Sequence, residues 1–364
     1  MARRLGAFSL VFSFFVCIAL AAAGDLDDCA YQREDLDRWI VGCTNVLMRG
    51  SASSPEQAII YESRGRAHEK KGEADKAIAD YTRAIELNPN FAQAYLNRGI
   101  AYGTKGRYDA AIADFTFAIE LNPKDAEAHA NRGNAYFFKR EHNKAIADYT
   151  RAIELNPKLA DAFYSRGSAH SAMGRYDAAI ADFTVVIELN PKDADAYYKR
   201  GMAYGVMGER DKAIADLTRA IELAPKNADA YYNRGVSYVY KRELDKAIAD
   251  FTRAIELNPN YEKAYGNRGI AYLIKHEYDK AIADFDRAIE LNPKNAKAYD
   301  SRGMAYRALG ENEKAIADHT SAIELDPKNA QAYNNRADAY KKLGYHDRAI
   351  ADYTRANELQ QQNP

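Results

Sequence analysis

The chain has 364 residues, of which 47% are hydrophobic, and its 51 lysines and arginines nearly balance its 52 aspartates and glutamates. A balanced charge provides no electrostatic attraction for nucleic acid or for anionic lipid, so neither is expected as a partner. The apolar content is high enough for a continuous core, which excludes a largely disordered chain.

The first 23 residues have the composition of a secretory signal peptide. Arg3 and Arg4 precede an uncharged apolar run from Leu5 to Ala23, which ends in small residues that suit a signal peptidase. A run of this length could also just span a bilayer. We therefore expect an extracytoplasmic protein, periplasmic or secreted, with a membrane anchor over residues 5–23 as the alternative.

From residue 58 onward the sequence repeats with a period of 34 residues, which eight of the ten prolines follow. A fixed period of this length indicates an array of small structural units rather than separate globular domains. We predict a signal peptide over 1–23, an N-terminal cap with a degenerate half-repeat over 24–57, and nine units over 58–91, 92–125, 126–159, 160–193, 194–227, 228–261, 262–295, 296–329 and 330–363.

Each unit has the pattern of two amphipathic helices. In the unit 92–125 the first helix carries an apolar stripe at i, i+4 and i+7, formed by Tyr95, Gly99 and Tyr102. Gly106 interrupts this pattern, and Asp109 is predicted to cap the second helix. The buried stripe of the second helix consists of Ala111, Phe115, Ala118 and Ile119. One such hairpin cannot bury its apolar face, whereas a stack of them can.

The units resemble the tetratricopeptide repeat at its diagnostic positions. These are an aromatic residue at position 4, Gly at 8, Tyr at 11, Ala at 20, an aromatic at 24, Ala at 27 and Pro at 32, and the resemblance covers residues 58–363. It implies an all-α fold, a right-handed superhelical solenoid of helix-turn-helix repeats, of the exported bacterial type. It also implies a scaffold that binds a protein or peptide rather than an enzyme, while fold-level analogy leaves the partner unidentified.

The units depart from the family at position 7, where the family usually has Leu and this chain has Arg in all nine units, from Arg64 to Arg336. Position 23 is Asp in all nine units, from Asp80 to Asp352. Because opposite charges recur with the same period, we predict that each Arg pairs with an Asp of its own or of the neighbouring unit. A ligand-binding role for the arginines is the alternative.

In the tetratricopeptide family, positions 2, 5, 6, 9 and 13 of the first helix line a concave groove that holds an extended peptide or a partner helix. Position 6 is Asn in five units, and an Asn amide both donates and accepts, so a ladder of them could hold a peptide backbone. The predicted ladder consists of Asn97, Asn131, Asn233 and Asn267, with Asn335 in the last unit. It is similar to the asparagine ladders of O-linked glycosyltransferases and nuclear import receptors; ordinary surface asparagines are the alternative.

The other groove positions are apolar in the middle of the array. The residues predicted to contact a peptide are Tyr164, Tyr198 and Tyr232 at position 5 and Met202, Val236 and Ile270 at position 9, and position 13 adds Phe138, Val206, Tyr240 and Ile274. Large apolar residues outside the core stripe, repeated in register, indicate an interaction surface. Packing between adjacent first helices is the alternative.

The segment before the first unit is predicted to be a half-repeat, because residues 37–47 align with residues 75–85. The offset predicts a longer loop from Gly50 to Pro55. Cys43 takes the place of the core aromatic Tyr81, and Cys29 lies 14 residues upstream, where a first-type helix is expected. In an oxidising compartment we predict a disulfide between the two cysteines, with a redox pair or a metal site as the alternatives.

At the other end, the last unit has Ala337, Asn357 and Gln361 in place of the usual Gly, Ile and Pro. A terminal repeat needs a polar outer face for solubility, so this unit is predicted to be a cap.

No arrangement of residues indicates catalysis, and we expect no enzyme activity, no metal and no cofactor. The histidines that replace core residues of the repeat are His68, His129, His170 and His319. The sequence thus predicts an exported scaffold that binds a protein or peptide in its groove. The alternatives are a self-assembling structural protein and, if residues 5–23 stay attached, a membrane-anchored assembly factor.

Overall fold

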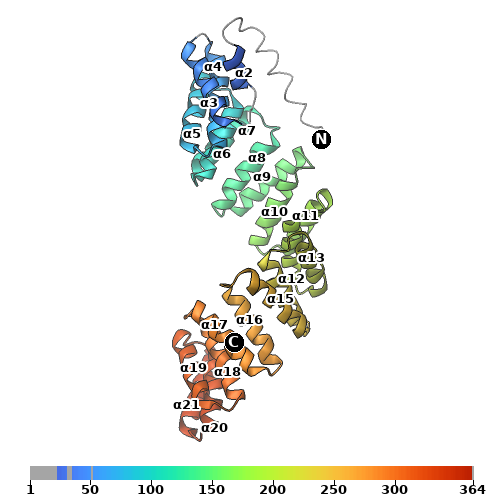
Figure 1. Ribbon diagram of the computed structural model, residues 1–364, viewed down its shortest axis with the longest axis vertical. Helices are drawn as coiled ribbons and strands as arrows, with labels where there is room; N and C mark the ends of the chain where they lie inside the picture. The colour runs from blue at the N-terminus through green and yellow to red at the C-terminus, as the bar shows by residue number, and fades with distance from the viewer. Residues whose placement is uncertain (1–22, 31–34, 51, 363–364) are drawn as a thin grey trace. The chain divides into compact units, whose positions relative to one another are not determined.

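The computed structural model describes residues 23–30, 35–50 and 52–362, and every regular element in these ranges is an α-helix (Figure 1). The predicted signal peptide lies outside the described residues except for Ala23. The helices are α2 (Ala23–Ala30), α3 (Leu36–Arg49), α4 (Ser54–Lys70), α5 (Ala74–Leu87), α6 (Ala92–Thr104), α7 (Tyr108–Leu121), α8 (Ala126–Phe138), α9 (His142–Leu155), α10 (Ala160–Ala172), α11 (Tyr176–Leu189), α12 (Ala194–Val206), α13 (Arg210–Leu223), α14 (Ala228–Tyr240), α15 (Leu244–Leu257), α16 (Glu262–Ile274), α17 (Tyr278–Leu291), α18 (Ala296–Ala308), α19 (Asn312–Leu325), α20 (Ala330–Lys342) and α21 (His346–Gln362).

The chain divides into two compact units, Met1–Met173 and Gly174–Pro364. The first contains α2 to α10 and the second contains α11 to α21. Within each unit every helix packs on the helix before and after it, and first helices of successive repeats also touch, as α4 and α6 do. Contacts limited to neighbouring repeats define a solenoid, so the predicted all-α repeat solenoid is confirmed.

The two helices of a repeat approach closely where the first helix has glycine. A Cβ atom added to Gly99 on α6 would lie 2.6 Å from the ring of Phe115 on α7, closer than two carbon atoms can come. Ala111 on α7 is fully buried in the same contact region. The small residues of the repeat therefore make room for one buried aromatic ring between the helices.

The prediction that Asp109 caps the second helix is wrong, as the turn between the two helices shows. Gly106 adopts a positive φ of 71°, and the N–H of Arg107 donates to the carbonyl of Tyr102 at 2.9 Å, which ends α6 and starts α7 at once. Arg107 is the residue before α7, so Asp109 lies inside the first turn and does not cap it. Its carboxylate instead pairs with Lys139 of the next repeat, an exposed contact between repeats.

Three turns lack the glycine that this conformation favours. Arg140, Arg242 and His276 have φ values of 62°, 63° and 62°, whereas the corresponding residue of the other repeats is glycine. A side chain in the left-handed region costs about 1 kcal/mol. These three repeats therefore carry local strain on the edge where the first helix ends.

The arginine of each repeat joins three helices. Arg98 on α6 donates from Nε and Nη2 to the two carboxylate oxygens of Asp114 on α7, both at 2.8 Å. Its Nη1 donates to Thr82 Oγ1 on α5, in the preceding repeat, at 3.1 Å. Because the Thr82 hydroxyl gives its own proton to the carbonyl of Ile78 at 2.7 Å, its oxygen can only accept from the arginine.

The predicted ion pair is thus confirmed and lies within one repeat. The bidentate pairs are Arg64–Asp80, Arg98–Asp114, Arg132–Asp148, Arg200–Asp216, Arg234–Asp250, Arg268–Asp284, Arg302–Asp318 and Arg336–Asp352. The side chains are largely withdrawn from water, with 16% of Arg98 and 6% of Asp114 exposed. We call this contact the arginine clamp. Removing one partner of such a pair would leave an uncompensated buried charge.

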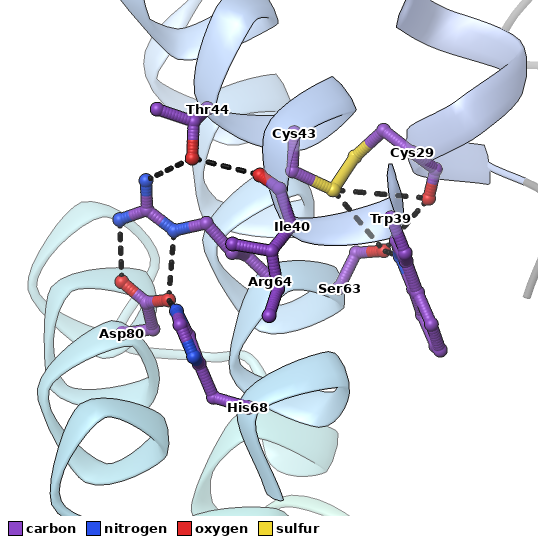
Figure 2. Close-up of a disulfide and its surroundings, with 9 residues drawn as sticks. All are labelled: Cys29, Trp39, Ile40, Cys43, Thr44, Ser63, Arg64, His68 and Asp80. Carbon is purple, nitrogen blue, oxygen red and sulfur yellow. Dashed lines mark hydrogen bonds and ion pairs between the residues drawn. A yellow bond between two sulfur atoms is a disulfide. The ribbon is translucent and has the colours of Figure 1, made fainter. Parts of the chain in front are cut away.

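The N-terminal cap is held by the disulfide between Cys29 on α2 and Cys43 on α3, with an S–S distance of 2.01 Å (Figure 2). Ser63 on α4 links this pair to the first repeat. Its hydroxyl accepts from the indole N–H of Trp39 and donates to the carbonyl of Cys29, each at 2.9 Å. Trp39 is 1% exposed, so the cap has a core of its own that continues into the first repeat.

Helix α3 occupies the place of a second helix, as the alignment predicts. Arg64 Nη1 donates to Thr44 Oγ1 at 3.0 Å, the contact that Arg98 makes with Thr82 of the repeat before it. Lys71 pairs with Asp37 in the way that Lys139 pairs with Asp109. The two inter-repeat contacts are therefore already present between the cap and the first repeat.

The contact between the two helices of the cap differs from that of a repeat. Gly42 stands at the clamp aspartate position, and a Cβ atom there would lie 2.8 Å from Cβ of Asp28 on α2. The close approach leaves no room for a carboxylate, and the disulfide joins the two helices instead.

The predicted long loop from Gly50 to Pro55 is wrong. Helix α4 begins at Ser54, four residues before the expected start of the first unit, because Ser53 and Glu56 form a capping box. The Ser53 N–H donates to the Glu56 carboxylate at 2.7 Å. The extra residues therefore lengthen a helix rather than a loop.

Candidate binding surface

The groove positions of three successive first helices form an apolar surface in the second compact unit. It consists of Met202 and Val206 on α12, Val236 and Tyr240 on α14, and Ile270 and Ile274 on α16, and we call it the apolar strip. Residues four apart on a helix lie on one face, and α12, α14 and α16 touch in sequence. The strip therefore extends over three successive repeats.

The strip is exposed through residues at both position 9 and position 13. Val206 is 62% exposed, Tyr240 is 66% exposed and Ile270 is 37% exposed, whereas Met202 and Val236 are half-buried. Packing between adjacent first helices and exposure as an interaction surface therefore both occur among these positions. Position 9 is half-buried at Met202 and Val236 and exposed at Ile270. Position 13 is exposed at Val206 and Tyr240 and half-buried at Ile274.

Cationic groups lie beside the most exposed residue of the strip. The guanidinium carbon of Arg210 on α13 is 4.2 Å from the centre of the Tyr240 ring. Arg242, two residues after Tyr240, is exposed on the turn with positive φ. A guanidinium against one face of the ring orients it and leaves the phenol edge exposed.

The tyrosines of position 5 are tied to the next repeat. The amide of Asn233 donates to the Tyr198 hydroxyl at 3.2 Å, and the amide of Asn267 donates to the Tyr232 hydroxyl at 2.7 Å. Burial raises the pKa of Tyr232, so this phenol keeps its proton at neutral pH. Since Tyr232 accepts in this bond, its own proton can be donated to a carbonyl of a bound chain.

The first unit contains fewer exposed groove residues. Tyr164 on α10 is half-buried, as are Tyr198 and Tyr232 in the second unit. Phe138 at the end of α8 is 62% exposed, and one of its faces stacks on Tyr108 with the ring centres 5.3 Å apart.

Several asparagines of the predicted ladder form hydrogen bonds within the array. Asn97 is only 8% exposed, its amide donates to Glu62 on α4 at 2.7 Å, and its oxygen accepts from Gln93 at 2.9 Å. Asn233 uses its amide on Tyr198 and on the carbonyl of Asp229. Asn131 is half-buried on α8.

The ladder prediction is wrong for Asn97 and Asn335, which are 8% and 3% exposed, and the reason is geometric. Successive first helices pack so that position 6 of one repeat faces position 5 of the repeat before it. The amides of Asn97, Asn233 and Asn267 therefore bond polar groups of the repeat before, and Asn335 does the same by donating to Asp300 at 3.1 Å.

Glu62 is a buried carboxyl at the first of these boundaries. It is 6% exposed, and burial raises its pKa from 4.5 to about 7. The attraction of Arg66, whose Nε is 3.8 Å away, and the hydrogen bond from Asn97 act in the opposite direction and lower the pKa. Burial is the largest cause, so the carboxylate form is the one that the fold disfavours.

Three of the histidines that replace core residues are buried. His68 and His129 are 8% and 7% exposed, and His319 is fully buried against Asp300, with its Nδ1 2.7 Å from the carboxylate. Within the described ranges, no cluster of His, Cys, Asp or Glu could hold a metal ion. Nor does any helix there combine the length and apolarity needed to cross a membrane.

Sequence profiles of the tetratricopeptide repeat match residues 92–125, 126–159, 194–227, 228–261, 262–295 and 330–363, at the boundaries set by the sequence period. Further profiles of the same repeat match residues 65–106, 148–181, 170–208, 285–317 and 303–344. The chain belongs to the tetratricopeptide repeat (TPR) family. It is therefore a TPR scaffold, and its apolar strip occupies the first-helix positions expected for the groove of such repeats.

Solved structures of other TPR proteins are similar over parts of the chain. YrrB, a TPR protein with an unusual peptide-binding site, is 29% identical, with 50% of this chain and 95% of YrrB covered and a TM-score of 0.46. A TPR protein from Parabacteroides merdae is 22% identical, with 69% and 98% covered and a TM-score of 0.50.

A chain of the APC/C hetero-tetramer Cut9–Hcn1 is 17% identical, with 86% of this chain and 64% of that chain covered and a TM-score of 0.52. At this identity the similarity establishes the fold alone. No curated protein matches the chain.

Proposed function

We propose that this TPR protein is a non-enzymatic, exported scaffold that binds an extended segment of a protein partner along the apolar strip. The observation that carries the proposal is the exposure of Val206, Tyr240 and Ile270, at 62%, 66% and 37%, on three successive first helices. Contiguous exposed apolar surface is costly in water and marks interaction sites.

The strip offers both kinds of contact that an extended peptide requires. Its aliphatic and aromatic side chains accept apolar side chains of the partner. The Tyr232 hydroxyl, held by Asn267 at 2.7 Å, can donate to a main-chain carbonyl. This arrangement supports recognition of side chains by the strip, with one fixed polar group to orient the backbone.

Two features support export. The sequence begins with Arg3, Arg4 and an apolar run that suits a secretory signal peptide. The Cys29–Cys43 disulfide joins the cap helices, and disulfides of this kind persist in oxidising compartments outside the cytoplasm. A mature chain that starts at Ala22, Gly24 or Asp25 keeps both cysteines and the Asp25 contact with Arg49.

The binding proposal is tested by selecting displayed random peptides on the full chain and measuring their affinity for two double variants. Val206→Ser/Tyr240→Ser should weaken binding by at least about tenfold, because it removes the exposed apolar contacts. The matched control, Leu189→Ser/Leu325→Ser, removes side chains that are 40% and 41% exposed on second helices and should bind as the wild type does. Peptides that bind both variants equally, or a failure to select any peptide, would contradict the proposal.

The export proposal is tested by sequencing the N-terminus of the protein recovered from cell fractions. A start at Ala22, Gly24 or Asp25 in the extracytoplasmic fraction is the expected result. A chain that retains Arg3 and sediments with membranes would instead identify an anchored protein.

A further inference from the structure

Each boundary between repeats uses the same positions on a second helix, and the boundary between α5 and α6 shows all of them. Thr82 accepts from Arg98 at 3.1 Å, and Asp75 accepts from Lys105 at 2.6 Å. Between these polar contacts, Ile85 and Ile78 on α5 pack in clusters with two alanines of α6, Ala94 and Ala101.

The residues of α6 that make these contacts, together with its C-cap Lys105, form one stripe. Ala94, Arg98, Ala101 and Lys105 are separated by four, three and four residues, which places them on one face of a helix. Both alanines are fully buried at the boundary. A helix with this stripe is therefore the natural ligand of a second helix of this protein.

The last helix, α21, retains most of this docking face. Asp347, Ile350 and Thr354 correspond to the aspartate, the first isoleucine and the threonine of the other second helices, and Asn357 replaces the second isoleucine. All four are exposed, and 62% of Ile350 is open to solvent. Among the described residues, α21 packs only on α20. The outer face of the cap is therefore less polar than the substitutions predict.

Thr354 is prepared in the same way as its counterparts. Its hydroxyl donates to the carbonyl of Ile350 at 2.8 Å, so its oxygen can serve only as an acceptor. Thr82 and Thr320 make the same internal bond and each accept from the arginine of the following repeat. The oxygen of Thr354 is thus available to accept a hydrogen bond, as its counterparts do from arginine.

We propose that the face of α21 formed by Asp347, Ile350 and Thr354 docks a helix of a partner protein that carries Arg and Lys seven residues apart, with small residues beside them. The choice of occupant rests on charge, because Asp347 attracts a cation and the equivalent threonine and aspartate on α5 accept from Arg98 and Lys105. This site lies at the end of the array and is independent of the apolar strip.

A second copy that stacks end to end through α2 fits this face poorly. Among the described residues α2 is the helix at that end, and its sequence contains Asp25, Asp27 and Asp28 and neither Arg nor Lys. Asp28 is already paired with Arg38 in its own cap. Like charges would therefore meet at Asp347, which disfavours a filament of this protein.

The test uses a fluorescent peptide with the sequence of residues 92–105, held helical by a hydrocarbon staple on the face opposite Arg98 and Lys105. Helicity is checked by circular dichroism, because a helix of this length is marginal by itself. Binding to the full chain is measured by fluorescence anisotropy. A peptide with Arg98→Ala and Lys105→Ala should bind at least about tenfold more weakly, since it lacks both charged donors.

Variants of the full chain locate the site. Thr354→Val should weaken binding by about tenfold, and Ile350→Glu by at least as much, because a carboxylate replaces an apolar contact. The control Leu325→Glu, at a residue that is 41% exposed on α19, should bind as the wild type does.

Three results would overturn the proposal. They are absence of binding by the helical peptide, equal binding to Ile350→Glu and to the wild type, and a dimer of the full chain in light scattering that Ile350→Glu dissociates. The last result would assign the face to a second copy. Loss of peptide selection on the apolar strip would not affect this test, so the two proposals fail separately.

Discussion

Replacing Glu62 with Gln should stabilise the first repeats at neutral and alkaline pH and leave their stability unchanged in mild acid. The amide has nearly the shape of the carboxyl and can still accept the hydrogen bond that Asn97 donates at 2.7 Å. It carries no charge, so it removes the cost of burying one. The variant thus isolates the ionisation of a single group.

The magnitude follows from the pKa of Glu62. Burial raises it from 4.5 to about 7, a shift that corresponds to about 3 kcal/mol. Because the folded pKa lies above the unfolded one, the folded state binds the proton more tightly between these values. The associated stability is present below the unfolded pKa and is lost as the pH rises through the folded pKa, so the wild type should weaken between about pH 5 and about pH 8.

The assay is urea unfolding followed by the fluorescence of Trp39, the only tryptophan of the chain. Its indole donates to Ser63, the neighbour of Glu62 on α4, so its emission reports on this end of the array. The free energy of unfolding of Glu62→Gln should exceed that of the wild type by about 3 kcal/mol at about pH 8 and match it at about pH 5. The control Glu86→Gln removes an exposed carboxylate and should change little at either pH. A wild type whose stability does not fall over this range would refute the reasoning.

Three further outcomes test the other elements. Arg234→Met should lower the free energy of unfolding by about 3 kcal/mol, because it leaves Asp250 buried without its partner. Hydrogen exchange in α14 and α15 should then accelerate. Unchanged protection would show that the clamp is dispensable. Cys43→Ser should lower the free energy of unfolding of the cap by about 3 kcal/mol. The urea midpoint of Trp39 fluorescence should then be lower and should match that of the wild type under reductant. A midpoint equal to that of the oxidised wild type would argue against a stabilising disulfide. Arg242→Gly should raise the free energy of unfolding by about 1 kcal/mol, because glycine adopts the positive φ without strain. A lower stability in calorimetry would contradict the presence of strain.

The fold was predictable from the sequence because its period is unbroken and its small residues recur where helices must touch. The pairing of Arg98 with Asp114 was predictable for the same reason, since the two types recur at a fixed distance of 16 residues. Its third contact was present in the sequence too. Threonine stands at the Thr82 position in every unit except one, where Asp286 replaces it, and this recurrence was the signal for an inter-repeat acceptor.

The role of the asparagines could not be predicted from a single repeat. Asn97 faces Glu62 because of the rotation between successive first helices, which the period alone does not define. The start of α7 escaped prediction for a related reason. Backbone hydrogen bonds around Gly106 fix the turn, and the aspartate that follows is then free to bind the next repeat.

The most direct test of the binding surface is photo-crosslinking from the full chain in the cells that produce it. Benzoylphenylalanine is placed either at Tyr240, which is 66% exposed on the apolar strip, or at Phe117, which is 52% exposed on a second helix. The strip predicts a discrete crosslinked protein from position 240 and none from position 117. Crosslinks from position 117 alone would contradict the assignment of the strip as the binding surface.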